Sequence, residues 1–325
     1  MAPAVHLLTI NNRRLVRSSW VFSMRILTSR STYMGGAASL LALAVAGCTT
    51  PSPRDVEASQ SEAVLVDMNE AAPTMAMNDV APAAADLCLA SGPQTPRDIA
   101  SAYGINPIKF AIAPEPEALN LCNIHTHTNA EHKAPGFNVY AGDGPTGGYR
   151  CNETDELTEA ELVDPANGEG AFKGVKPGDT IEVHWVYSSC DVAPGEGLGS
   201  CLSDACENPT LRVEAQAFLV VNDASAIDFN DYVYENTVVD GFHQPKTLPA
   251  GTGTPVVFRG STTGPSYDQS TCSPLQVTWS VRPMCARVDI SSLNEWASRG
   301  NVFNETRSHG VRALVTAPEL LSQIE

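Results

Sequence analysis

The chain has 325 residues, of which 20 are lysine or arginine and 37 are aspartate or glutamate, so its formal net charge is -17. A chain this acidic lacks the basic face that a phosphate backbone requires, which argues against nucleic acid as a partner. The length suffices for one large domain or two modest ones with a sizeable core.

Residues 1–47 are predicted to be an export signal rather than part of a fold. Arg25 and Arg30 precede a run of small and apolar residues, 34–46, that is too short to span a bilayer as a stable helix. The run ends in VAGC, which resembles a bacterial lipobox and implies cleavage before Cys48 and a diacylglycerol on its thiol. We therefore predict a lipoprotein signal peptide and a membrane anchor at Cys48. The alternative is an ordinary cleaved signal peptide.

Residues 48–86 are predicted to be a flexible acidic tether. After Cys48 the segment is rich in Ala, Pro, Ser, Asp and Glu, and it contains no aromatic residue and no sustained apolar period. Such a composition cannot bury enough surface to offset the entropy lost on ordering. We therefore predict one folded domain over 87–325, held in the bacterial cell envelope (the periplasm or the outer membrane).

Eight cysteines remain once Cys48 is assigned to a lipid, and all of them fall in the predicted domain. They are Cys88, Cys122, Cys151, Cys190, Cys201, Cys206, Cys272 and Cys285. An even number in an exported chain favours disulfides and an oxidising compartment. The sequence does not choose among the pairings.

The chemistry of the domain concentrates in residues 121–140, LCNIHTHTNAEHKAPGFNVY, which hold three of the seven histidines. Side chains alternate along a β-strand, so His125 and His127 are predicted to project from one face with their imidazoles close together. Imidazole is the commonest protein ligand for zinc, and catalytic zinc sites typically use three protein ligands and leave the fourth position to water. The pair therefore requires a third ligand from elsewhere.

The best candidate for the third ligand is His184, in the segment DTIEVHWVY. There Ile181, Val183 and Trp185 alternate with Glu182 and His184, which predicts a half-buried strand with both polar side chains on one face. Glu182 would then orient a ligand from behind. Three imidazoles also accept cobalt or cadmium, so counting ligands does not by itself select zinc.

The rest of the domain is predicted to consist of short strands separated by turns. Strands are predicted over 211–222, 256–259 and 275–281, and short helices over 157–162, 291–299 and 318–324. The predicted fold class is therefore mostly β (α+β), with a single domain around a twisted, largely antiparallel sheet and few short helices.

The segment CNIHTHTNAEHKAPGF, followed by IEVHW, resembles the delta-class carbonic anhydrases of marine algae and their bacterial relatives. The resemblance covers roughly residues 86–325. It implies a zinc-dependent enzyme that hydrates CO2 to bicarbonate and a proton.

A weaker similarity to the alpha-class carbonic anhydrases implies their fold and assigns roles to residues. The motifs shared in the same order are His125-Thr126-His127, Glu131-His132, Glu182-Val183-His184, Gly260 to Pro265 and Val277-Thr278-Trp279. The spacer before Glu131 is shorter here, one residue is missing before Thr262, and an insertion with Cys272 precedes Val277.

The alpha-class similarity implies that His125, His127 and His184 ligate zinc. It implies that Thr262 accepts a hydrogen bond from the reactive hydroxide and donates one to Glu131, while Thr263 lines the substrate side. His132 then becomes a structural neighbour of the ligands, like Glu182.

Turnover also requires a proton to reach bulk water, for which a histidine is suited because its pKa lies near ambient pH. His132, His243 and His309 are the candidates for this proton shuttle, and the sequence does not choose among them.

Two other functions remain open at this stage. One is a non-catalytic metal- or carbohydrate-binding surface lipoprotein on a similar β-scaffold, which would keep a histidine cluster without needing Glu131 and Thr262. The other is a zinc hydrolase that acts on esters through the same kind of metal hydroxide.

Overall fold

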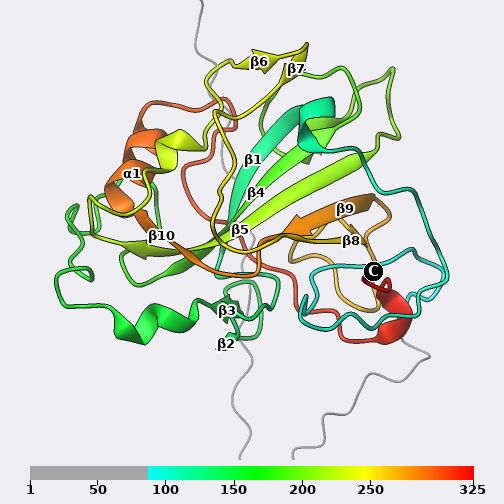
Figure 1. Ribbon diagram of the computed structural model, residues 1–325, viewed down its shortest axis with the longest axis horizontal. Coiled ribbons are helices and arrows are strands. Elements are labelled where there is room, and N and C mark those ends of the chain that lie inside the picture. The colour runs from blue at the N-terminus through cyan, green and yellow to red at the C-terminus, as the bar shows by residue number, and fades with distance from the viewer. Residues whose placement is uncertain (1–86) are drawn as a thin grey trace, which may run out of the picture. The chain divides into compact units, whose positions relative to one another are not determined.

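The computed structural model describes residues 87–325, and its centre is a six-stranded sheet (Figure 1). The strands of this sheet are β1 (Asn120–Thr128), β4 (Thr180–Ser188), β5 (Leu211–Val221), β8 (Val256–Ser261), β9 (Gln276–Val281) and β10 (Ala286–Asp289). The mostly β prediction is confirmed. The predicted signal peptide, the Cys48 anchor and the tether lie outside the described residues.

Strand β5 organises the sheet because both of its edges are paired. β4 runs antiparallel along one edge. Along the other edge β9 pairs with the first half of β5 and β10 with the second half, both in parallel. β1 adds antiparallel to β4, and β8 adds antiparallel to β9. The sheet is therefore mixed, with three antiparallel and two parallel pairings.

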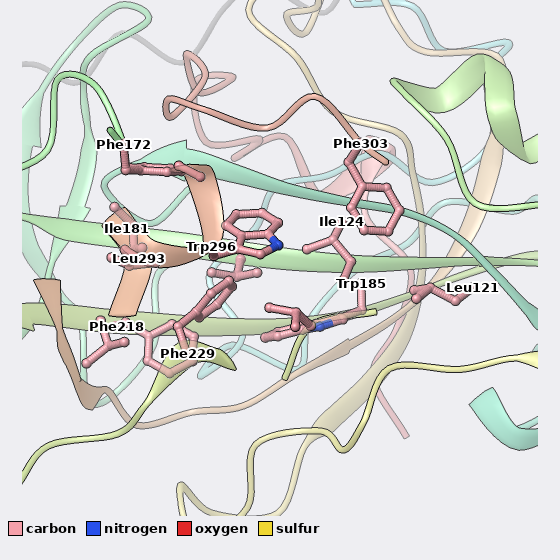
Figure 2. Close-up of a cluster of buried hydrophobic side chains, with 14 of the residues drawn as sticks. Leu121, Ile124, Phe172, Ile181, Trp185, Phe218, Phe229, Leu293, Trp296 and Phe303 are labelled. Atoms are coloured by element: carbon pink, nitrogen blue, oxygen red, sulfur yellow. The ribbon is translucent and has the colours of Figure 1, made fainter. Parts of the chain in front are cut away.

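The two faces of the sheet pack against different hydrophobic clusters. One face lies against the helix α1 (Ile290–Ser298), where Trp296 and Leu293 meet Trp185 and Phe218 (Figure 2). The other face carries a second cluster that includes Phe137, Phe258 and Trp279.

Because both faces are covered, every residue of β4 and β5 is buried. The prediction of a half-buried β4 is therefore wrong, although its alternation of side chains is as predicted.

Two small hairpins flank the sheet: β2 (Val139–Gly142) with β3 (Gly148–Arg150), and β6 (Val238–Val239) with β7 (Phe242–His243). The turn between β6 and β7 is Asp240-Gly241, and both residues have positive φ, 51° and 93°. This is the two-residue turn whose twist matches that of paired strands.

Of the three predicted helices, one is an α-helix in the structure. The helix at 291–299 is confirmed as α1, whereas residues 157–162 form turns without a helix. Six residues are too few to nucleate a helix without strong packing. The segment 318–324 yields only a 3-10 turn at Pro318–Leu320, because beyond it the carbonyl of Ser322 turns aside to accept a hydrogen bond from Arg97.

Four disulfides account for all eight cysteines of the described chain, which confirms that prediction and indicates an oxidising compartment. The pairs are Cys88–Cys272, Cys122–Cys201, Cys151–Cys285 and Cys190–Cys206.

Residues 87–325 include no helix with the length and apolar character needed to cross a membrane.

Candidate metal centre

Three imidazoles meet on the face of the sheet opposite α1. His125 and His127 alternate along β1 and project from the same side, and His125 stands directly opposite His184 of β4 in the antiparallel register. The ring centroids are 4.7 to 5.0 Å apart. One nitrogen from each ring forms a set within 4.8 Å of one another. The structure thus brings together the three predicted metal ligands.

The hydrogen bonds behind the rings determine which nitrogen faces the centre. His125 Nδ1 donates to the Asn123 amide oxygen at 2.7 Å, and His127 Nδ1 donates to the carbonyl of Gly310 at 3.0 Å. His184 Nε2 lies 3.6 Å from the Glu182 carboxylate, whose charge favours a proton on that nitrogen. The lone pairs are therefore on His125 Nε2, His127 Nε2 and His184 Nδ1.

This arrangement of nitrogens fits a cation. His125 Nε2 and His184 Nδ1 face each other at 3.2 Å, and His127 Nε2 is buried without a hydrogen-bond partner among the described residues. Lone pairs that converge in this way repel one another, and a bound cation replaces the repulsion by three coordinate bonds. Three neutral imidazoles with an open fourth position are the donor set of catalytic zinc sites.

Burial favours the neutral form of His125 and His127. Burial, reinforced by the neighbouring His127 and His184, holds the pKa of His125 well below its usual range. Burial also lowers the pKa of His127, although Glu131 opposes this effect. A metal must displace any proton on its ligand, so a lowered pKa favours metal binding near neutral pH.

Glu182 lies behind the three imidazoles, next to His184 and His132. One of its oxygens accepts hydrogen bonds from the backbone N–H of Glu131 at 2.7 Å and of His132 at 3.4 Å, and the other contacts His132 Nδ1 at 3.0 Å. Burial works to raise the pKa of Glu182, but His132 and then His184 hold it well below its usual range. The carboxylate is therefore charged and shared between two histidines.

His132, Glu182 and His184 form a second group with metal-ligating geometry. Two observations favour a supporting role for this group. His132 and Glu182 already bond to each other directly, and His132 is wholly buried beside Trp279, with ring centroids 4.7 Å apart. His132 is thus a structural neighbour of the ligands.

The turn after β1 brings Glu131 and His132 beneath the sheet. Asn129 has a positive φ of 61°, and its N–H donates to the carbonyl of Thr180. Gly148 packs so closely on this turn that a Cβ there would come within 2.4 Å of the Ala130 carbonyl oxygen. A glycine is therefore required at position 148 for the turn to close.

Glu131 is buried between His127 and the C-terminal part of the chain. Its Oε1 accepts the N–H of Arg312 at 3.0 Å and lies 3.5 Å from His127 Nδ1, while Oε2 has no partner among the described residues. The hydrogen bond predicted from Thr262 to Glu131 is not formed. The Thr262 hydroxyl instead lies within hydrogen-bond distance of the Ser273 hydroxyl, because the insertion before β9 places Ser273 beside it.

A cavity of about 290 Å³ opens onto the candidate site. His125 and His127 form part of its wall, and His184 lies deeper, 1 % exposed. The remaining wall includes apolar Leu198, Pro265 and Phe303 and polar Asn123, Glu196, Asn304, Glu305 and His309. Thr262 and Thr263 directly precede Gly264 and Pro265 of this wall.

Of the three histidines considered as proton shuttles, His309 alone lines this cavity. Its side chain is 48 % exposed, its Nε2 lies 2.9 Å from Glu305 Oε2, and its ring centroid is 6.4 Å from that of His125. The hydrogen bond to Glu305 raises the pKa of His309. His132 is fully buried. His243 is not part of the cavity wall, and its Nδ1 lies 2.8 Å from the Tyr234 hydroxyl.

Several residues of the site were not predicted. Asn123 stands two positions before His125 in the same strand, so alternation alone would have placed it on the ligand face. The Gly310 carbonyl gave no such signal, because it reaches His127 through a tertiary contact. Glu305 lies only four residues before His309, but a tertiary contact with Thr126 brings it to the site.

The fold and the site define the class: a mostly β protein with a candidate three-histidine metal centre at the wall of a cavity. The family model for delta carbonic anhydrase matches residues 116–292, which is more than half of the chain. The chain therefore belongs to the delta carbonic anhydrase family. A search of curated proteins finds no match. The matched range contains all three imidazoles but ends before Glu305, His309 and Gly310.

Proposed function

We propose that this protein is a zinc-dependent carbonic anhydrase (carbonate dehydratase, a zinc lyase) that converts CO2 and water reversibly to bicarbonate and a proton. The observation that carries the proposal is the convergence of His125 Nε2, His127 Nε2 and His184 Nδ1 beside an open cavity in a member of this family.

Zinc is the metal that this donor set favours, and when bound it supplies a Lewis acid that lowers the pKa of a water molecule to about 7. The residues of the chain orient the ligands and shape the cavity. Asn123, Gly310 and Glu182 fix the orientation and tautomer of the three ligands. Apolar Leu198 and Phe303 provide a wall against which CO2 can lie without displacing water from polar groups.

Thr262 and Thr263 are proposed to act on the substrate side. In the sequence the two threonines directly precede Gly264 and Pro265, which line the cavity. A threonine hydroxyl that accepts a hydrogen bond from the nucleophile directs its lone pair toward CO2, which lowers the entropic part of the barrier.

The test is hydration of CO2 measured by stopped flow, with zinc counted by mass spectrometry. We expect about one zinc per chain, loss of hydration when a chelator removes the metal, and recovery on adding zinc back. Zinc binding with hydration at buffer background would instead favour the non-catalytic metal-binding alternative.

Replacing Glu131 by glutamine should keep zinc bound and slow hydration by about 10- to 100-fold, because the carboxylate charge 3.5 Å from His127 Nδ1 is lost. The amide oxygen can still accept the Arg312 N–H, so the local fold is kept. Zinc content and hydration rate are the measurements. Glu159→Gln, at an exposed glutamate, is the matched control. Loss of zinc from Glu131→Gln would contradict a role limited to orientation.

Replacing His309 by alanine should slow hydration by about 100-fold in dilute buffer, because the proton then lacks a relay at the cavity mouth. Concentrated imidazole buffer should restore the rate, since free imidazole can carry the proton. His243→Ala, at a histidine outside the cavity wall, should behave as wild type in both buffers. An equal loss for His309→Ala in both buffers would place its effect in the structure of the site.

The protein is further proposed to be a lipoprotein of the bacterial cell envelope, anchored through Cys48. The lipobox-like VAGC and the oxidising compartment that the four disulfides indicate support this proposal. Cys48→Ser should move the protein from the membrane fraction to the soluble fraction of the producing bacterium. Unchanged fractionation would contradict lipid attachment.

A further inference from the structure

The Cys88–Cys272 disulfide differs from the other three in its accessibility. Both of its cysteines are partly exposed, whereas every other pair in the described chain contains one cysteine at 0 % exposure. These buried members are Cys122, Cys151 and Cys190. A reductant acts by thiolate attack on a sulfur atom, so it must reach that atom first. The Cys88–Cys272 bond is therefore the one that a reductant reaches most readily.

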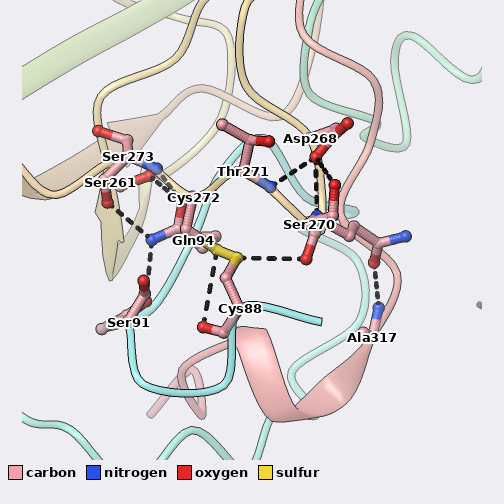
Figure 3. Close-up of a disulfide and its surroundings, with 12 residues drawn as sticks. Cys88, Ser91, Gln94, Ser261, Asp268, Ser270, Thr271, Cys272, Ser273 and Ala317 are labelled. Carbon is pink, nitrogen blue, oxygen red and sulfur yellow. Dashed lines mark hydrogen bonds between the residues drawn. A yellow bond between two sulfur atoms is a disulfide. The ribbon is translucent and has the colours of Figure 1, made fainter. Parts of the chain in front are cut away.

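This bond ties the start of the described chain to residues 268–273 (Figure 3). Around it the contacts are mainly hydrogen bonds within and between loops at the surface. Cys88 N–H donates to the Gln269 carbonyl at 3.1 Å, and the Gln269 side chain accepts the N–H of Ala317 at 2.8 Å. The apolar cluster beneath contains only four buried residues, separate from the main core. Regions with so little buried apolar surface are the first to open.

The same segment holds Thr262 in place. Ser273 follows Cys272 directly and is fully buried; its hydroxyl lies against that of Thr262. The Gln94 side chain holds Ser273 on both sides, accepting from its N–H at 2.9 Å and donating to its carbonyl at 3.0 Å. Gln94 lies six residues after Cys88, and Ser273 directly follows Cys272. The disulfide therefore holds together the two segments whose contact fixes Ser273 beside Thr262.

We propose that the Cys88–Cys272 bond is a redox-sensitive lock on the Thr262 segment, opened by a dithiol reductant. A thiolate of the reductant attacks one sulfur to form a mixed disulfide, and its second thiol then displaces the remaining cysteine. The protein gains two thiols, and the reductant becomes a disulfide, with two electrons and two protons transferred.

Opening the lock frees Ser273 and so misplaces the Thr262 hydroxyl, a consequence for activity that rests on the proposed function. A misplacement of about 1 Å can slow a reaction by about 100-fold even when the change lies far from the chemistry, so we expect at least about a tenfold loss of CO2 hydration if Thr262 acts on the substrate side as proposed. Cys88 lies outside the residues that the family model matches, which makes the lock a feature of this chain rather than of the matched region.

The test uses the purified protein in a graded series of dithiothreitol concentrations. At each point free thiols are alkylated and identified by mass spectrometry, and zinc content and hydration rate are measured. We expect Cys88 and Cys272 to be labelled first, with loss of activity at constant zinc and recovery after reoxidation. Cys88→Ser/Cys272→Ser should have the low activity throughout and no response to dithiothreitol, whereas Cys190→Ser/Cys206→Ser should keep the wild-type response.

Two outcomes would overturn the lock. In one, another pair is labelled before Cys88 and Cys272. In the other, these two are reduced while hydration is unchanged. If the oxidised protein hydrates no CO2 at all, the proposed function fails on its own. In that case cleavage by a protease within residues 263–275, faster after reduction than before, still supports the lock, and unchanged cleavage overturns it.

Discussion

His184→Ala is expected to lose both zinc and CO2 hydration, with metal affinity reduced by more than about 100-fold, because even a residue that only supports a ligand is worth 10- to 100-fold. His184 contributes the nitrogen nearest to His125, 3.2 Å away, and it is the deepest of the three rings. Alanine removes that nitrogen and leaves two imidazoles, which cannot complete a catalytic zinc site.

The measurements are zinc per chain after dialysis against a weak chelator and the hydration rate at saturating CO2. His243→Ala is the matched control, because it removes an imidazole from the same domain without touching the cavity wall. Full zinc content in His184→Ala would mean that His184 is not a ligand, and the neighbouring His132 would become the next candidate for the third ligand.

Glu182→Ala is expected to lower the free energy of unfolding by about 3 to 5 kcal/mol, because each buried donor left without its acceptor costs about 1 to 3 kcal/mol. The Glu182 carboxylate is fully buried and accepts hydrogen bonds from the backbone of Glu131 and from the backbone and ring of His132. Without it, these donors lose their acceptor in a place that water does not reach.

Chemical denaturation of the metal-free protein measures this loss without the contribution of zinc binding. Glu159→Ala, at an exposed glutamate, should change the unfolding free energy by less than about 0.5 kcal/mol. Glu182→Gln keeps the volume but not the charge, and it should weaken zinc binding by about 10- to 100-fold. A Glu182→Ala protein as stable as wild type would mean that His132 and the turn after β1 are held by other contacts.

The faces of the strands on which the three candidate ligands lie could be predicted because they depend on local geometry. Alternation along a strand places His125 and His127 on one face, and the same alternation places His184 beside Glu182. The strands β5, β8 and β9 were likewise visible as apolar or alternating runs. The strand order was not, because the parallel addition of β9 and β10 to one edge of β5 depends on contacts between distant segments.

The surroundings of the ligands were harder to predict for the same reason. The acceptor for His127 is a backbone carbonyl, that of Gly310, and any residue type supplies a carbonyl. The partner of Thr262 was predicted from motif order, and the structure places Ser273 there instead because the insertion before β9 folds back on it. The order of motifs along a chain does not determine which side chains form hydrogen bonds, because those depend on how the loops between the motifs fold.

The segment from Glu305 to Arg312 seals the outer edge of β1, with the N–H of Thr128 and the carbonyl of Thr126 both paired to His309. A ribosome makes this segment after every strand of the sheet. During synthesis and export the nascent chain therefore contains all three ligand histidines before it contains the residues that orient His127 and cover the edge strand. We therefore expect a metal to bind this site about 10- to 100-fold more tightly once residue 312 has emerged than in a stalled chain that already has all three histidines.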